Sequence, residues 1–424
     1  MKRRLLFIAH RVPYPPDKGE RVRAFHEIEA LAQHFRVTVA TLTHQPSDVE
    51  AAAELKRWCE KVITAPAGGK VGLVRGALAL LRGRSVTEGF FRSRRLAQAL
   101  REEAEREPFD LVLAYSSSTL PYALSVSAGA RIADLVDVDS AKWATYAQVA
   151  RWPRRWLYRR EARGVRSLEQ RALDQCDAVI LVSDAETRAL GVESDKAVAI
   201  GNGVDTEYFK PTGDEEVSPP SLVFTGTMDY KPNIDGVCWF VREVWPALRR
   251  DVPGLTFSIV GRNPTRAVRR LADVPGVTVT GSVPDVRPYL AKAAVAVAPL
   301  LIARGVQNKI LEAMAMGRAV VASPEALEGL EVAVGTDSLQ ARTPNEWQRC
   351  ILELLQDKAR RQQIEHAART CVEQKYTWTA RLQPLLDLCE RLGAGCEAGA
   401  PSATLPDEPA ASASPNVESE VPAR

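Results

Sequence analysis

The stretch ARGVQNKILEAMAMGRAVVAS, residues 303–323, decides the fold, because a polar segment leads directly into an apolar helix and then into a strand. Apolar residues recur at helical spacing from about Val306, and Gly317 ends the helix before the Val-rich strand. Lys309 and Glu312 lie one turn apart on the same helical face. A carboxylate on such an apolar helix raises the question of what it binds.

The start of this helix is suited to an anion. Its first N–H groups, from about Val306 to Lys309, lack partners within the helix, and Lys309 adds a full positive charge. The Glu312 carboxylate can accept two hydroxyl hydrogen bonds, as vicinal ribose hydroxyls offer. The pattern therefore predicts a nucleoside diphosphate here. The alternative is a weak surface ion pair between Lys309 and Glu312.

The same alternation of strands and helices extends over the rest of the chain. Apolar runs followed by helical patterns predict an α/β protein of two Rossmann-like, doubly wound domains facing a cleft. We predict an N-terminal domain over 1–203, a C-terminal domain over 204–375, a final helix over 376–392, and a disordered tail over 393–424, which is rich in Ala, Pro, Ser and Glu.

Composition narrows the function. A net charge of +3 is too small to indicate nucleic-acid binding. The seven cysteines lack metal-like spacing, so no metal site is expected. The apolar run in MKRRLLFIAH is too short for a signal peptide, and no window approaches 18 uncharged apolar residues. We therefore expect a cytoplasmic protein.

Glycines follow several predicted strands, where backbone can approach a ligand closely. Gly226 lies in FTGTMDYKPN (224–233), whose Lys231 precedes a helix, and Gly261 and Val283 lie in IVG and VTGSVPD. Gly19 lies in HRVPYPPDKGERVR, which follows the first predicted strand. In that loop Arg21 and Arg23 are expected to meet anions, against the alternative of a solvated turn.

Two further segments have competing interpretations. In VDVDSAKW (136–143), Asp139 is either a carboxylate facing the cleft or a helix cap. In RWPRRWLYRREARGVR (151–166), arginines alternate with Trp152, Trp156 and Tyr158, a composition suited to the inner face of an anionic membrane. Otherwise the segment is a charged helix whose aromatic residues belong to the core.

Taken together, these motifs resemble the retaining glycosyltransferases of family 4, which have the GT-B fold. The resemblance covers about residues 1–392 and rests on NGVD (202–205) with Phe209 and Pro211, FTGTMDYKPN, IVG, VTGSVPD and NKILEAMAMGRAVVAS. PYPPDKGERVR, DVDSAKW and RGVQNKILEAMAMG are most similar to sugar transferases associated with PEP-CTERM/exosortase systems and exopolysaccharide loci.

The resemblance implies transfer of a sugar, with retained configuration and without a metal or other cofactor, from a nucleotide-diphosphate sugar to a glycan or polyprenyl-linked acceptor. The acceptor would bind the N-terminal domain, and the final helix, with Trp378, would cross back onto it. The implied catalytic residues are Asp139, Arg304 and Glu312. The implied donor-binding residues are Gly19, Gly226, Lys231, Gly261, Val283, Gly305, Val306, Gln307, Asn308, Lys309 and Glu312.

The chain departs from the family pattern at three places. Arg304 stands where the first glutamate of the E-x7-E motif is usual, Thr227 where a phosphate-loop arginine is usual, and Ser116–Ser118 where relatives carry a histidine. Two alternatives therefore stand beside the transferase. One is a nucleotide-sugar 2-epimerase of the same architecture, and the other is a non-catalytic scaffold that binds a glycan or a nucleotide sugar.

Overall fold

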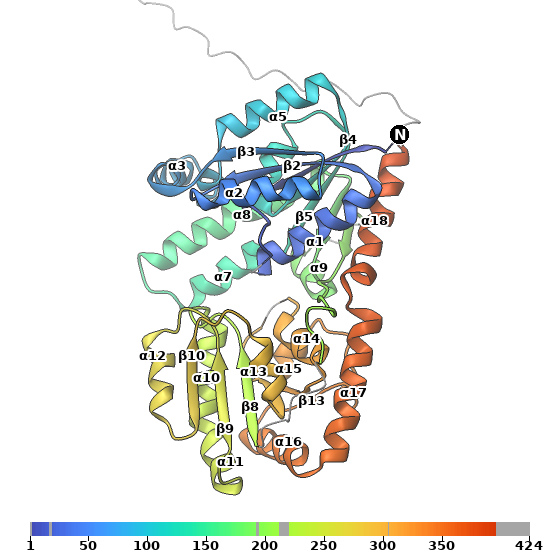
Figure 1. The fold of residues 1–424 in the computed structure, drawn as a ribbon. Helices are drawn as coiled ribbons and strands as arrows, with labels where there is room; N and C mark the ends of the chain where they lie inside the picture. Colours follow the sequence, from blue (N-terminus) through green and yellow to red (C-terminus); the bar gives the residue numbers. More distant parts are fainter. Residues whose placement is uncertain (1, 17–18, 192–194, 212–219, 304, 396–424) are drawn as a thin grey trace, which may run out of the picture.

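The computed structural model describes residues 2–16, 19–191, 195–211, 220–303 and 305–395. These residues form two α/β domains, one above the other in Figure 1, with α17 and α18 running along one side of both. The disordered tail expected over 393–424 falls almost entirely outside the described residues, and α18 continues through Gly395.

The N-terminal domain is built on a parallel sheet. In the described part of the chain this sheet has seven strands, in the order β3-β2-β1-β4-β5-β6-β7. Their bounds are β1 (Arg4–Ala9), β2 (Arg36–Thr43), β3 (Lys61–Pro66), β4 (Phe109–Tyr115), β5 (Ala128–Val136), β6 (Ala178–Leu181) and β7 (Ala197–Ala199). The helices are α1 (Gly19–His34), α2 (Ser47–Glu54), η1 (Leu55–Arg57), α3 (Gly69–Leu81), α4 (Val86–Phe90), α5 (Arg94–Arg106), η2 (Ser117–Thr119), α6 (Leu120–Ala123), α7 (Asp139–Val149), α8 (Arg154–Gln175) and α9 (Asp184–Leu190).

Both faces of this sheet are covered, which explains why its strands are continuous apolar runs. In β1, Leu5 and Phe7 point into the hydrophobic cluster that includes α1 and α18. The alternate residues, Leu6 and Ile8, point into the cluster on the opposite face, which includes α5. The period of two along a strand therefore divides one apolar run between two cores.

The C-terminal domain repeats this arrangement. Its described residues form a parallel six-stranded sheet in the order β10-β9-β8-β11-β12-β13. The strands are β8 (Ser221–Thr225), β9 (Thr256–Val260), β10 (Val277–Gly281), β11 (Val295–Ala298), β12 (Ala319–Ala322) and β13 (Leu339–Gln340). The helices are α10 (Lys231–Glu243), α11 (Trp245–Asp251), α12 (Arg266–Arg269), η3 (Arg270–Asp273), α13 (Arg287–Lys292), α14 (Asn308–Ala315), α15 (Pro324–Leu327), α16 (Pro344–Gln356), α17 (Lys358–Lys375) and α18 (Trp378–Gly395).

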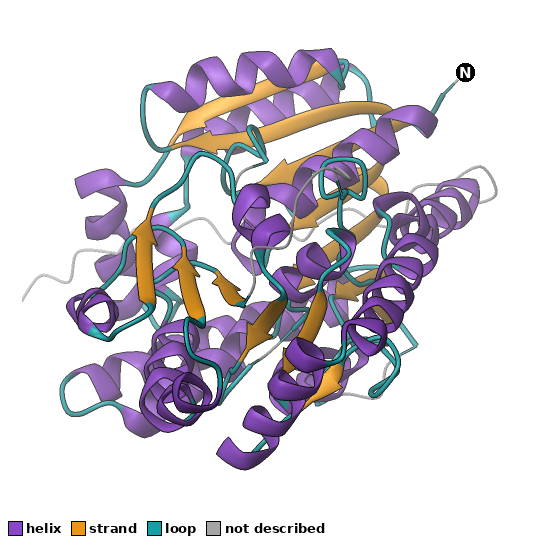
Figure 2. Cartoon of the chain, turned by 60° about the horizontal axis from the view of Figure 1, so that its bottom comes forward, coloured by secondary structure: helices purple, strands orange, loops and turns teal. Residues whose placement is uncertain are grey.

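Figure 2 shows helices beside the strands of both sheets. Two parallel, doubly wound sheets confirm the predicted α/β fold class. The quoted stretch forms α14 and β12, as predicted, although α14 begins at Asn308 rather than near Val306.

The chain crosses between the domains twice. The crossing segment, residues 200–211, leads from β7 towards the second domain, and the backbone N–H of Val204 in this segment donates to the Tyr376 carbonyl oxygen (2.7 Å). At the end of the described chain, α18 returns to the first domain, where Leu382, Leu385 and Cys389 are buried in the same cluster as β1. The predicted crossing of the final helix is therefore confirmed.

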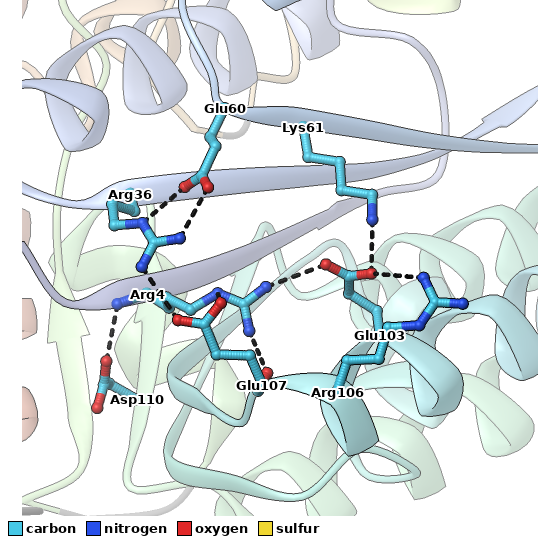
Figure 3. A network of polar contacts seen from close by, with 8 residues as sticks. All are labelled: Arg4, Arg36, Glu60, Lys61, Glu103, Arg106, Glu107 and Asp110. Carbon is cyan, nitrogen blue, oxygen red and sulfur yellow. Dashed lines mark hydrogen bonds and ion pairs between the residues drawn. The ribbon is translucent and has the colours of Figure 1, made fainter.

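A network of charged side chains lies at the amino ends of the strands of the first sheet (Figure 3). Arg4 is 6 % exposed, and its Nη2 donates to Glu103 Oε1 (3.0 Å). Glu103 Oε2 in turn accepts from Lys61 (2.6 Å), and Arg36 pairs with Glu60 (2.8 Å). The charges at this edge are therefore paired with one another.

Candidate active site

Two glycine loops meet at the carboxyl ends of β8 and β9. Gly226 and Gly261 have φ angles of +156° and +155°. The Gly226 N–H donates to the Val260 carbonyl oxygen (3.0 Å), and a Cβ on Gly261 would lie 1.7 Å from the Gly226 carbonyl oxygen. No side chain fits at position 261, so backbone alone forms this part of the site.

Lys309 joins the glycine loop to α10 and α14. Its Nζ donates to Asn233 Oδ1 (2.7 Å), and Asn233 Nδ2 donates to the Thr227 carbonyl oxygen (2.9 Å). A Cβ on Gly226 would approach Asn233 Nδ2 to 2.8 Å and Lys309 Cε to 3.4 Å. The Lys309 ammonium also lies 5.0 Å from the Phe224 ring centroid. The first turns of two helices and the end of β8 therefore converge on one cation.

The electrostatics of this cluster follow from its burial. Burial lowers the pKa of Lys309 to about 8, although the nearby Glu312 carboxylate opposes the shift. Burial also raises the pKa of Glu312 to about 7, and here Lys309 opposes it. In both groups, the loss of hydration outweighs the attraction between the two charges. The charged form of each side chain is therefore less favourable here than it would be at the surface. A ligand that offers an anion to Lys309 and hydroxyl donors to Glu312 would relieve both costs.

The N-terminal domain contributes a carboxylate through an irregular end of β5. Val136 has a φ angle of +66°, and the pairing of β5 with β6 shifts register there. Asp137 follows, and its Oδ1 lies 3.0 Å from the position that a Cβ on Gly305 would occupy. Burial, with Glu186 and Asp139 nearby, raises the pKa of Asp137 to about 6. Asp137 therefore lies against the loop that precedes α14.

Asp139 has different surroundings. It is the first residue of α7, and its Oδ1 lies 3.6 Å from Lys142 Nζ. Burial raises the pKa of Asp139, and Lys142 opposes the shift. Of the two carboxylates, Asp137 is the one whose contact with the second domain the structure records. The sequence DVDS showed that both carboxylates follow a strand. It did not predict the backbone turn at Val136 that gives the two side chains different surroundings.

The structure places the remaining predicted residues unevenly. Lys231 pairs with Asp235 (2.5 Å) on the exposed side of α10, whereas Asn233 occupies the position beside Lys309. Arg304 lies outside the described residues, and Gly19 is the first residue of α1. Val283, in the loop after β10, and Val306, before α14, are half-buried against the core of the second domain. Gln307 and Asn308 lie at the start of α14.

Arg23 meets a carboxylate of the protein itself and does not face the cleft. Its side chain is buried, and Nη2 donates to Asp134 Oδ2 (2.7 Å) within the first domain. The neighbouring Arg21 lies with its Nη2 3.8 Å from Asp48 Oδ1. Helical geometry explains Arg23, since its side of α1 faces the sheet.

Comparisons with known proteins support the class that this geometry suggests. A family described as Glycosyltransferase Family 4 matches residues 18–208, and one described as Glycosyl transferases group 1 matches residues 219–357. A comparison of the sequence with curated proteins gave no match. The two family matches lie end to end, one on each domain.

Solved structures share the whole architecture. A sucrose-phosphate synthase from Thermosynechococcus elongatus is 19 % identical, with a TM-score of 0.70 over 93 % of this chain and 100 % of that one. Anabaena HepE in complex with UDP-glucose is 14 % identical, with a TM-score of 0.63 over 92 % and 99 %. A TarM variant of S. aureus in complex with fondaparinux, alpha-GlcNAc-glycerol and UDP is 10 % identical, with a TM-score of 0.63 over 92 % and 100 %.

The two sheets, the paired glycine loops and the helix-bound lysine define a glycosyltransferase of the GT-B class. Within that class the chain belongs to the family 4, group 1 glycosyltransferases, whose two parts match its two domains in order. The resemblance to family 4 glycosyltransferases with the GT-B fold is confirmed, whereas the similarity to PEP-CTERM/exosortase-associated transferases stays a prediction.

Proposed function

We propose that this enzyme transfers a sugar, with retention of configuration and without a metal, from a nucleotide-diphosphate sugar. The observation that supports this most directly is the convergence of Lys309, Asn233 and the glycine loops at the start of α14. The donor diphosphate would bind there, and Glu312 would accept its ribose hydroxyls. The HepE complex, which holds UDP-glucose in the same fold, supports a donor of this type.

The chemistry requires charge stabilisation on the leaving group. When the sugar leaves, negative charge grows on the diphosphate, and Lys309 with the α14 N–H groups is held in place to meet it. Across the domain boundary, Asp137 rather than Asp139 would contact the acceptor hydroxyl or the transferred sugar. Arg304 stays a candidate for the position of the first motif glutamate.

A thermal-shift screen tests the donor proposal. UDP, GDP and ADP, each with and without an attached sugar, should give at least one rise in the Tm, because a ligand that binds only the native state stabilises it. If none of them changes the Tm at millimolar concentration, the donor assignment is refuted. Lys309→Met should abolish any observed shift, whereas Lys231→Met, on the exposed side of α10, should keep it.

Turnover distinguishes the proposal from its two alternatives. Incubation with the donor alone should leave the sugar unchanged, whereas a 2-epimerase would convert it to its epimer. Addition of a polyprenyl-linked or free glycan acceptor should then release the nucleoside diphosphate and yield a glycoside of unchanged anomeric configuration. Donor binding without turnover on a panel of such acceptors would instead indicate a scaffold.

For the acceptor we propose a lipid-linked glycan of cell-surface or exopolysaccharide synthesis, reached from a membrane surface. Across the described part of the chain, no helix is long and apolar enough to span a membrane. However, among the residues that the structure describes, nine of the fifteen exposed large apolar side chains lie on α3 or around the α7–α8 connection. These nine form the N-domain apolar face: Val71, Leu73, Val74, Leu78, Leu81, Val149, Trp152, Trp156 and Leu157.

Basic side chains accompany these apolar residues. Glu161 of α8 accepts hydrogen bonds from Ser85 Oγ (2.7 Å) and Thr87 Oγ1 (2.6 Å), which fixes the α3–α4 segment against α8. Trp152 is 82 % exposed and Trp156 is 53 % exposed, so the interpretation of these two tryptophans as core residues is wrong. Beside α3, a hollow of about 610 Å³ is lined by five arginines, Arg75, Arg82, Arg84, Arg92 and Arg94. Apolar side chains among arginines suit an anionic lipid surface.

Vesicle co-sedimentation tests the face. The protein should bind phosphatidylglycerol-containing vesicles, and less so at high salt, because screening weakens attraction between exposed charges. The triple variant Trp152→Ser/Trp156→Ser/Leu81→Ser should lose that binding. The control variant Val49→Ser/Val334→Ser, which changes exposed apolar residues elsewhere, should keep it. Equal binding by both variants would refute the face.

A further inference from the structure

Arg23 is a buried arginine that the donor site does not contain. It lies on α1 with 1 % of its surface exposed. Its Nε and Nη2 donate to Asp134 Oδ2 (3.1 and 2.7 Å), and its Nη1 donates to the Ile200 carbonyl oxygen (2.8 Å) and to Asn202 Oδ1 (3.1 Å). A buried charge persists only when such partners compensate its lost hydration. The guanidinium fork therefore ties a strand of the first sheet to the crossing segment.

One branch of this network leads to the carboxylate at the domain boundary. The Oδ1 of Asp134, the oxygen that Arg23 leaves free, accepts from the Val136 N–H (2.9 Å). Val136 has the positive φ angle that ends β5, and the Asp137 N–H turns back to the Leu135 carbonyl oxygen (2.9 Å). Asp134 thus supports the turn that places Asp137 beside Gly305.

The other branch leads to the first residue of α14. Asn202 accepts from Arg23 and donates through Nδ2 to Asn308 Oδ1 (3.3 Å). Asn308 directly precedes Lys309. The crossing segment packs closely against the start of α18, since a Cβ on Gly203 would lie 2.8 Å from the Trp378 Cα.

Both branches start from Arg23 in the first domain and end on residues 305–308 of the second domain. We infer that Arg23 is a positioning residue for transfer, which sets the start of α14 relative to the Asp137 carboxylate. It touches neither substrate, so it would act through Asn202 and Asp134. This inference rests on the proposed binding of the donor diphosphate at α14, and it adds what aligns that site with the N-terminal domain.

Nearby Glu27 is consistent with this role. Its Oε1 lies 2.8 Å from Arg23 Nε, and the carboxyl group is completely buried. Burial, followed by the Asp134 carboxylate, raises the pKa of Glu27 well above its usual range. Glu27 thus lies beside the same guanidinium that binds Asp134.

The test uses substitutions that keep the buried charge compensated. In Arg23→Lys, an ammonium can still pair with Asp134 but cannot reach Asn202 at the same time. In Asn202→Ala, Arg23 keeps its bonds to Asp134 and to the Ile200 carbonyl oxygen, whereas its bond to Asn202 and the link from Asn202 to Asn308 are removed. We expect each variant to lose about tenfold in kcat with little change in the donor KM. The double variant should be no slower than either single variant, because both break the same link.

Arg4→Lys is the matched control. Arg4 is also buried and multiply bonded, but its partners lie at the other edge of the sheet (Figure 3). It should lower the Tm about as much as Arg23→Lys while kcat stays near that of the unchanged protein. If Arg4→Lys and Arg23→Lys reduce kcat equally, or if the losses in Arg23→Lys and Asn202→Ala multiply in the double variant, the inference is refuted.

A readout without substrate separates this inference from the proposed function. Hydrogen–deuterium exchange of the donor-free protein should become faster over residues 305–312 in Arg23→Lys and in Asn202→Ala, and stay unchanged in Arg4→Lys. Failure of UDP, GDP and ADP to bind would refute the donor assignment and leave this exchange result unaffected. Unchanged exchange in Arg23→Lys would refute the linkage even in an active transferase.

Discussion

Replacing Glu312 by glutamine should weaken nucleotide binding without destabilising the protein. Burial raises the pKa of Glu312 from 4.5 to about 7. Because the folded-state pKa exceeds the unfolded value, the carboxyl group lowers the stability as the pH rises from 4.5 to about 7, and the full effect persists above pH 7. A shift of this size means that folding makes the ionised form of Glu312 less favourable, relative to its neutral form, by roughly 3 kcal/mol. Glutamine removes this cost, although Lys309 loses its neighbouring charge.

The same substitution removes a hydrogen-bond acceptor from the proposed ribose site. A hydrogen bond to a charged group contributes about 1.5–3 kcal/mol, and losing one such bond weakens binding by roughly 10- to 150-fold. Calorimetric titration with UDP, GDP and ADP at pH 8, together with the Tm of the ligand-free protein, measures both effects. Glu353→Gln is the control: it alters a surface pair between Glu353 of α16 and Arg360 of α17, and it should change neither quantity appreciably.

Two results would refute this reasoning. If Glu312→Gln bound the preferred nucleotide as tightly as the unchanged protein, Glu312 would not hold the ribose. If the Tm fell by several degrees while Glu353→Gln kept its Tm, the main role of Glu312 would be to stabilise the fold by pairing with Lys309. A stable variant with weakened binding is expected only for a ligand-binding carboxylate.

Three further predictions follow from the same site. Gly261→Ala should lower the free energy of unfolding by at least about 3 kcal/mol, because the new Cβ would overlap the Gly226 carbonyl group. Gly254→Ala is also at positive φ but in open space, so it should lower the free energy of unfolding by less. Urea unfolding measures both values, and equal values would contradict the proposed contact. If the ionised Asp137 is required, kcat should fall as the pH drops through about 6, and Asp137→Asn should remove that limb of the pH profile; an unchanged profile would exclude Asp137. Lys309→Met should weaken nucleoside diphosphate binding by about 10- to 100-fold in calorimetry while largely keeping the Tm, because burial already disfavours its charge; undiminished affinity would remove Lys309 from the site.

The sequence predicted the features that depend on local patterns. Strands buried on both faces are continuous apolar runs, so both sheets could be recognised, and α14 with Lys309 and Glu312 followed from helical spacing. The glycines after β8 and β9 were also visible, because close backbone contact requires them. Nothing in the chain's local pattern predicted that the Gly226 carbonyl oxygen would leave no room for a Cβ on Gly261, because this contact depends on the pairing of two distant segments.

The remaining details depend on where an element begins or on distant partners. Lys231 was predicted in the site because FTGTMDYKPN was assigned to a loop, whereas α10 begins at Lys231. Side chains that are two positions apart in a helix point to nearly opposite sides. Asn233 therefore faces Lys309, whereas Lys231 pairs with Asp235. Likewise, the choice between Asp137 and Asp139 depends on the turn at Val136, which Asp134 stabilises from within the fold.

The return of α18 to the first domain affects the order in which this chain can fold during synthesis. One side of the first sheet is closed by Leu382, Leu385 and Leu388, which the ribosome adds long after β1 and α1. The N-terminal half must therefore emerge with an uncovered apolar surface and wait for the end of the chain. A fragment ended after the crossing segment should accordingly aggregate or recruit chaperones, and the two halves of the enzyme cannot be prepared as independent modules by cutting between them.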